Sequence, residues 1–169
     1  LLALDRLFAM ETPRPRLQEI ALALGSDVPF FLSGGTAYAT GRGEVLTPLP
    51  AIRGVPLLLI MPPERVSTRE AFARITRYSA PLGLDRFRML NERGFFSDPD
   101  ALTNDFEEPI FAMIPSLREL ERRLLQAGAV WAGMSGSGST MVGAFRDPKE
   151  RDKAADTLAD TRALAAETI

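Results

Sequence analysis

The strongest constraint on the fold is a continuous apolar run, Leu57-Leu58-Leu59-Ile60-Met61, which lies between Pro56 and the pair Pro62-Pro63. Prolines on both sides confine this run to one short element, because proline cannot donate to a neighbouring strand. A short run that is apolar at every position, and not only at alternate ones, is typical of a strand that is covered on both faces. We therefore expect residues 56–61 to form a central, buried strand.

The last third of the chain has a clear order of elements. Its patterns predict a helix over residues 116–127 that ends at Gly128, a strand over 130–135, a Gly/Ser turn, a strand over 140–145, a helix over 148–159 and a strand over 162–168. Together with the central strand, this order is β-α-β-β-α-β. It is typical of the ferredoxin-like split motif, an α+β domain whose four-stranded antiparallel sheet carries helices on one face.

The first third is expected to form two helices and a hairpin. Apolar residues at i, i+3, i+4 and i+7 predict a helix over residues 15–24, followed by Gly25 as a C-cap. Strands over residues 35–40 and 44–49 would form a hairpin around Gly41-Arg42-Gly43. Residues 1–8 indicate the middle of a helix without an N-cap, so we expect a preceding N-terminal portion to be absent from these 169 residues. Residues 1–54 and 55–169 are predicted to be separate domains.

Helices are also predicted over residues 67–78, 85–94 and 104–114. In the last of these, Asn104 and Asp105 would serve as helix caps and not as ligands.

Composition excludes several classes of chemistry. The chain has no histidine and no cysteine, which excludes Ser-His-Asp hydrolysis, a cysteine nucleophile, disulfides and most catalytic zinc sites. No cluster of Lys and Arg is interleaved with aromatic residues, and the net charge is −2, so nucleic acid is not an expected partner. No apolar run reaches the roughly 18 residues of a membrane span. We expect a soluble, cytoplasmic protein that is a monomer or a weak homodimer.

Asp27 is the first candidate for chemistry. It follows Gly25 and precedes Val28-Pro29-Phe30-Phe31, where Pro29 suits the first turn of a helix. One interpretation is an ordinary N-cap, which is the commoner role of an Asp at a helix start. The other is a reactive carboxylate, held on a glycine-flanked turn at the edge of a core, where its surroundings can tune it.

A second candidate is the turn Gly133-Met134-Ser135-Gly136-Ser137-Gly138-Ser139-Thr140 between two predicted strands. It is not a Rossmann fingerprint, because Met141 stands where the third glycine is needed, and it contains no Gly-Lys-Ser/Thr of a Walker A loop. Two interpretations stay open. The turn is either a flexible hairpin or a loop whose backbone amides converge on an oxyanion.

Taken together, these segments resemble one superfamily, the GHMP kinases, and within it the family of 4-diphosphocytidyl-2-C-methyl-D-erythritol kinases. The resemblance covers most of the chain and rests on residues 24–35, 41–44, 66–68 with Phe72, 104–107 and 133–140. It implies ATP-dependent phosphorylation, with Mg²⁺, of the 2-hydroxyl of a cytidine-diphosphate-linked substrate in non-mevalonate isoprenoid precursor synthesis. It also implies a ferredoxin-like C-terminal domain preceded by the end of an N-terminal domain.

The resemblance also implies a role for each matching residue. Asp27 would accept or orient the proton of the attacking hydroxyl. Thr68 and Phe72 would bind the substrate, with Phe72 stacked on the cytosine; from the helix pattern alone, core packing is the simpler interpretation of Phe72. The third motif of the family would line the site near the phosphates and comprises Gly136, Ser137, Gly138, Ser139 and Thr140. No residue is assigned as a metal ligand.

Two parts of the family pattern have no counterpart here, namely the catalytic Lys and the glycine-rich ATP loop. We therefore expect these 169 residues alone to lack kinase activity. Two alternatives stay open: another GHMP kinase, such as a homoserine, mevalonate or galactose kinase, and a ferredoxin-like ligand-binding module without catalysis.

Overall fold

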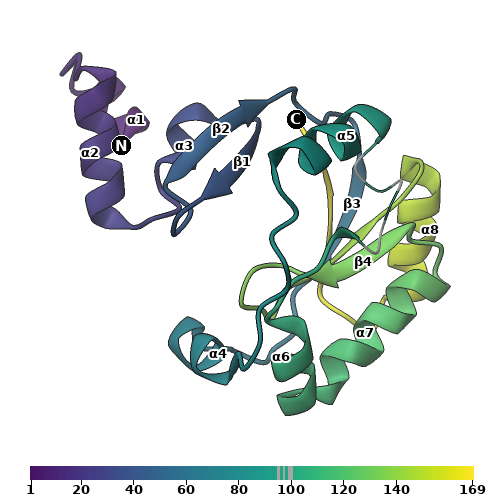
Figure 1. Ribbon diagram of the computed structural model, residues 1–169. Coiled ribbons are helices and arrows are strands. Elements are labelled where there is room, and N and C mark those ends of the chain that lie inside the picture. Colours follow the sequence, from purple (N-terminus) through teal and green to yellow (C-terminus); the bar gives the residue numbers. More distant parts are fainter. Residues whose placement is uncertain (95, 97, 99–100) are drawn as a thin grey trace. The chain divides into compact units, whose positions relative to one another are not determined.

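A computed structural model describes residues 1–94, 96, 98 and 101–169. The chain forms two compact units, Leu1–Ala51 and Ile52–Ile169, and each is described by itself (Figure 1).

The first unit contains α1 (Leu2–Leu7), α2 (Arg14–Leu24), α3 (Phe30–Ser33), β1 (Thr36–Thr40) and β2 (Val45–Leu49). Pro15 lies in the first turn of α2, where a missing amide hydrogen costs nothing. Leu17 and Ala21, one helical turn apart, are buried against Leu32 of α3. The helix ends where the Gly25 amide donates to the carbonyl of Ala21 at 3.1 Å. This confirms the predicted C-cap.

Strands β1 and β2 form the predicted antiparallel hairpin, in which Thr40 pairs with Val45. Gly41 and Gly43 adopt φ angles of +70° and +110°, which side chains with a Cβ rarely tolerate. The Glu44 carboxylate accepts a hydrogen bond from the Arg42 amide at 2.6 Å. Hydrogen bonds from its own amide and from that of Arg42 lower the pKa of Glu44. The tip of the hairpin is therefore stabilised by a hydrogen bond between two of its own residues, Arg42 and Glu44.

The second unit is built on a four-stranded antiparallel sheet, with β3 (Pro56–Ile60), β4 (Trp131–Met134), β5 (Met141–Ala144) and β6 (Ala163–Glu167). The strand order is β4-β5-β3-β6, so β3 lies between two neighbours. Leu58 pairs with Gly143 on one side and with Ala165 on the other. Leu58 and Ile60 are fully buried. The predictions of a central buried strand and of an α+β sheet are confirmed.

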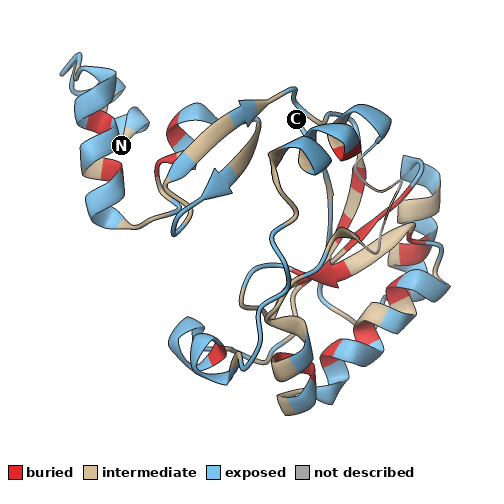
Figure 2. Ribbon diagram, in the orientation of Figure 1, coloured by how far each residue is buried: buried red, intermediate tan, exposed pale blue. Residues whose placement is uncertain are grey.

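Helices α7 (Pro115–Gln126) and α8 (Pro148–Thr157) pack against this sheet (Figure 1). Buried positions recur along α7, whereas α8 contains the single buried residue Ala154 (Figure 2). The apolar stripe of α7 meets β4 and β5, and a Cβ at Gly143 would lie 2.9 Å from Leu124, so the helix and the strand approach closely. Asp147 caps α8 by accepting from the amides of Lys149 and Glu150.

Between β3 and β4 the chain forms α4 (Thr68–Arg74), α5 (Leu84–Arg93) and α6 (Glu107–Met113). The helix predicted over residues 67–78 is too long, because Ile75 is extended at φ −70° and ψ 115° and begins a stretch that includes β-branched Thr76. The helix predicted from residue 104 begins only at Glu107, because Asn104 and Asp105 make other contacts. Within the described residues, no helix is long and apolar enough to cross a membrane.

Candidate functional site

Asp27 lies in the turn that joins α2 to α3 and is exposed. Its backbone carbonyl accepts from the Phe30 amide at 3.3 Å, but no side-chain hydrogen bond caps α3. The N-cap interpretation is therefore wrong for this helix. The side chain instead lies against the hairpin tip, since a Cβ at Gly43 would be only 2.6 Å from Asp27 Oδ1. Position 43 therefore requires glycine, because a side chain there would collide with the Asp27 carboxylate.

The third-motif loop, residues 136–140, connects β4 to β5. Two backbone hydrogen bonds close it: Ser135 N donates to Thr140 O at 2.9 Å, and Gly138 N donates to Ser135 O at 3.0 Å. The amides of Gly136, Ser137 and Ser139 have no backbone acceptor within the described residues. Free amides on small residues are able to donate to an oxyanion, so the loop stays a candidate for phosphate binding.

Thr68 and the loop are in direct contact. Thr68 Oγ1 and Ser137 Oγ lie 3.1 Å apart and share a hydrogen bond, although they are far apart in the sequence. Thr68 is the first residue of α4, and Phe72 lies one turn further along that helix. The structure therefore brings together three of the residues that the sequence singled out, on one helix and the loop beside it.

Phe72 is 54% exposed, so core packing is the wrong interpretation of this side chain. The Phe72 and Phe106 rings make an edge-to-face contact, with a centroid distance of 4.9 Å and an interplanar angle of 83°. In such a contact Phe106 covers at most one face of the Phe72 ring. A face of this ring that Phe106 does not cover is able to stack on a further aromatic group.

Asn104 supports the loop, a role that sequence reasoning missed. Its Nδ2 donates to the carbonyls of Met134 and Gly136, both at 2.9 Å, and its Oδ1 accepts from the Phe106 amide at 3.1 Å. It therefore binds the last residue of β4 and the first residue of the third-motif loop. No side chain caps α6, so the cap prediction for Asn104 and Asp105 is wrong.

Glu107 supports the same strand end, because its Oε1 accepts from the Met134 amide at 2.7 Å. Burial raises the pKa of Glu107, and the hydrogen bond from Met134 opposes that shift. Asp105 instead accepts from the amide and the hydroxyl of Ser79. The only available signal for these roles was the run of residues 104–107 itself, because its partners lie about thirty residues away.

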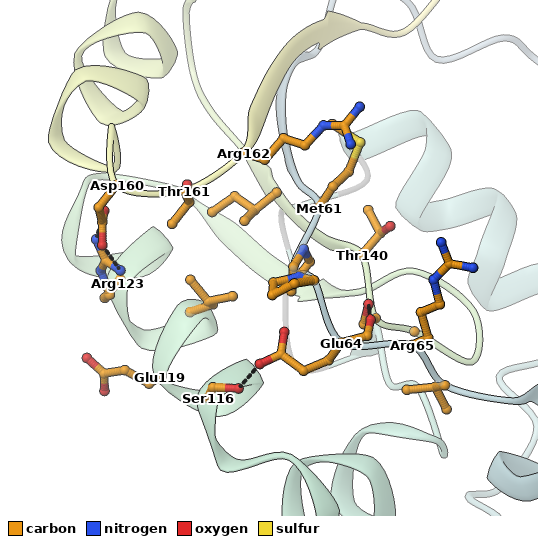
Figure 3. Close-up of a pocket in the computed structure, with 17 residues that line it drawn as sticks. Met61, Glu64, Arg65, Ser116, Glu119, Arg123, Thr140, Asp160, Thr161 and Arg162 are labelled. Carbon is orange, nitrogen blue, oxygen red and sulfur yellow. Dashed lines mark hydrogen bonds and ion pairs between the residues drawn. The ribbon is translucent and has the colours of Figure 1, made fainter.

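A second contact holds the end of the loop. Ser139 Oγ donates to the backbone carbonyl of Glu64, in the segment between β3 and α4. Gly138, Ser139 and Thr140 also line a cavity of about 800 Å³ that reaches α7 and the segment before β6 (Figure 3). The loop is thus supported at one end by residues 104–107 and at the other by residues 64–68.

Within the described residues, no group of three or more acidic side chains is arranged to hold a metal ion. These residues therefore do not form a dedicated Mg²⁺ cage. Asp27 belongs to the first unit, whereas Thr68, Phe72 and the third-motif loop belong to the second.

Comparison with known proteins gives a consistent result. Residues 88–163 match the family model described as GHMP kinases C terminal. The chain is 38% identical over 166 residues to a 4-diphosphocytidyl-2-C-methyl-D-erythritol kinase of Solibacter usitatus, with 95% of this chain and 52% of the relative covered. It is 44% identical over 140 residues to a chloroplastic kinase of the same name from Oryza sativa, with 75% of this chain and 33% of the relative covered.

Solved structures agree. A crystal structure of 4-(cytidine 5'-diphospho)-2C-methyl-D-erythritol kinase superposes with a TM-score of 0.83 at 34% identity, and the match covers 99% of this chain and 61% of that one. A homoserine kinase from Cytophaga hutchinsonii, with a TM-score of 0.66 at 16% identity, shares the fold, with 98% of this chain and 61% of that chain covered. The chain spans about half the length of the bacterial relatives that it matches.

Proposed function

Because this chain carries the C-terminal domain of a GHMP kinase, we propose that it serves ATP-dependent phosphorylation of the 2-hydroxyl of 4-diphosphocytidyl-2-C-methyl-D-erythritol. This reaction would belong to non-mevalonate isoprenoid precursor synthesis. The observation that supports the proposal best is the hydrogen bond between Thr68 and Ser137. It joins the loop suited to phosphate to the helix that presents an exposed aromatic ring, as a kinase with an aromatic base in its substrate requires.

In this proposal Asp27 accepts or orients the proton of the attacking hydroxyl. Its carboxylate is exposed and has no capping role, so it is available to a substrate. Contact with Gly43 limits where the carboxylate can rest, and a fixed position matters more than basicity in phosphoryl transfer.

Phe72 would stack on the cytosine ring, and Thr68 would bind the substrate beside it. An exposed aromatic face contributes about 1–3 kcal/mol per stacked base. Because Thr68 also shares a hydrogen bond with Ser137, a substrate bound at α4 would be held next to the third-motif loop.

The free amides of Gly136, Ser137 and Ser139 would donate to phosphate oxygens. ATP supplies the phosphoryl group when it is bound. Mg²⁺ in kinases is held largely by the phosphates together with one or two carboxylates.

The test is a steady-state kinase assay on the full-length protein, with this substrate compared against homoserine and mevalonate. We expect turnover only with the cytidine-linked substrate. Asp27→Asn should lower kcat at least about 100-fold, while Asp156→Asn, an exposed carboxylate on α8, should leave kcat unchanged. Phe72→Ala should raise KM by about 5- to 150-fold, and Phe72→Trp should retain the wild-type KM.

Turnover with homoserine or mevalonate, and none with the cytidine-linked substrate, would assign the chain to another GHMP kinase. Full activity of Asp27→Asn would remove this residue from the reaction and favour a binding module without catalysis.

A further inference from the structure

A cavity lies beside the end of the third-motif loop, and apart from the loop residues its walls have no role in the proposed reaction. It measures about 800 Å³, within the range that holds a small molecule. Its walls come from the end of β3 and the segment that follows it, from α7, from the loop, and from residues 160–162 before β6 (Figure 3).

Two of the three acidic groups in the wall form ion pairs, and the third, Glu64, accepts a hydrogen bond. Asp160 forms an ion pair with Arg123, and Glu119 forms one with Arg122, which lies outside the lining. Glu64 Oε1 accepts from the Ser116 hydroxyl at 3.1 Å, and Figure 3 shows this side chain directed toward α7. All three acidic side chains therefore interact with residues of α7.

Two arginines of the lining, Arg65 and Arg162, have no ion-pair or hydrogen-bonding partner for their guanidinium groups within the described residues. The backbone of Arg162 is held beside the end of β3, because Met61 N donates to Arg162 O at 2.9 Å. Arg65 lies four residues beyond Met61 in the same wall. In Figure 3, Thr140 lies between Arg65 and Arg162, on the side of the cavity away from the Arg123–Asp160 pair.

The remainder of the lining is largely apolar. Ile60 and Leu120 are buried at its base, and Val66 and the pair Pro62-Pro63 border it. Charged and hydroxyl groups complete the lining on both sides of these apolar residues, so the cavity can contact both an apolar and a polar part of a small molecule.

We propose that this cavity binds a phosphorylated small molecule with an apolar body. Its phosphate would lie between Arg65 and Arg162 and accept from the Thr140 hydroxyl. Two planar guanidinium groups match a dianion with three terminal oxygens better than they match a carboxylate, which has two. The apolar body would lie against Ile60 and Leu120, away from the cationic end.

A ligand bound in this cavity would contact the third-motif loop. Thr140 belongs to the loop and lines the cavity, and the neighbouring Ser139 is hydrogen-bonded to Glu64 in the same wall. A ligand that holds Thr140 therefore restrains the end of the loop.

The test is calorimetric titration of the full-length protein with hexyl phosphate and, separately, with methyl phosphate. We expect hexyl phosphate to bind at least about tenfold more tightly, because two or more methylene groups would leave water. The double variant Arg65→Gln, Arg162→Gln should weaken hexyl phosphate binding at least about tenfold. Arg53→Gln, an exposed arginine outside this cavity, is the matched control and should bind as wild type does.

Amide exchange supplies a second measurement, in which hexyl phosphate should slow exchange at residues 138–140. Equal affinity for the two phosphates, or unchanged binding by the double variant, would overturn the proposal, since phosphate would then bind elsewhere. Both measurements are made without kinase turnover, so their failure is distinguishable from a failure of the proposed function.

Discussion

Replacing Asn104 tests whether a side chain outside the third motif holds that loop in place. In Asn104→Asp the new side chain has the same shape and retains the acceptor for the Phe106 amide. It loses both donations, to Met134 O and Gly136 O, each 2.9 Å long. A net value of about 0.5–1.5 kcal/mol per hydrogen bond gives a loss of about 1–3 kcal/mol. Repulsion between the carboxylate and the two carbonyls places the result at the upper end of that range.

The assay is urea denaturation of the full-length protein together with amide exchange at residues 135–140. We expect a lower free energy of unfolding, faster exchange at these amides and a lower kcat. The loss should shrink at acidic pH, because the protonated carboxyl can again donate to one of the carbonyls. Asp105→Asn is the control, since Asp105 binds Ser79 and not the loop. Wild-type stability together with unchanged loop exchange in Asn104→Asp would refute this reasoning.

Three further predictions follow from other parts of the chain. Gly43→Ala should lower kcat more than Gly35→Ala, because both positions have positive φ but only a Cβ at Gly43 would meet the Asp27 carboxylate; equal effects in a kinase assay would contradict this. The raised pKa of Glu107 favours its protonated form in the folded state, so its contribution to stability is present below the ordinary value of 4.5 and is lost as pH rises through the folded-state pKa. Glu107→Gln should therefore gain stability relative to wild type as pH rises above 4.5, and denaturation curves with parallel pH dependence would exclude the effect. Residues 1–169 alone should release no ADP in a coupled assay, whereas measurable turnover would show that the chain needs no further Lys or ATP loop.

Much of the fold was predictable because its signals are local. The apolar run at residues 57–61 required a buried strand, and β3 lies at the centre of its sheet. Asp147-Pro148 gave the start of α8, where the Asp side chain caps two amides. The end of α4 was less predictable, because β-branched residues lower helix propensity only slightly and the pattern continued past Arg74.

The residues of the candidate site also differ in how far the sequence could predict them. Residue types and spacing singled out Asp27 and the third-motif loop, because a carboxylate on a glycine-flanked turn and a run of Gly and Ser are recognisable within a few residues. Thr68 and Phe72 were singled out only by the resemblance to the GHMP kinases. The roles of Asn104 and Glu107 were not predictable, since a side chain that holds a distant loop looks the same in sequence as a helix cap.

The sequence by itself determined the order of helices and strands and the loop with its small residues, because both depend on the preferences of neighbouring residues. Only the tertiary structure decided what holds that loop. Its supports are Asn104, Glu107, Glu64 and Thr68, which come from segments 27 to 75 residues away along the chain. Contacts between residues so far apart in the sequence depend on how the strands of the sheet are aligned. A local sequence pattern does not predict that alignment.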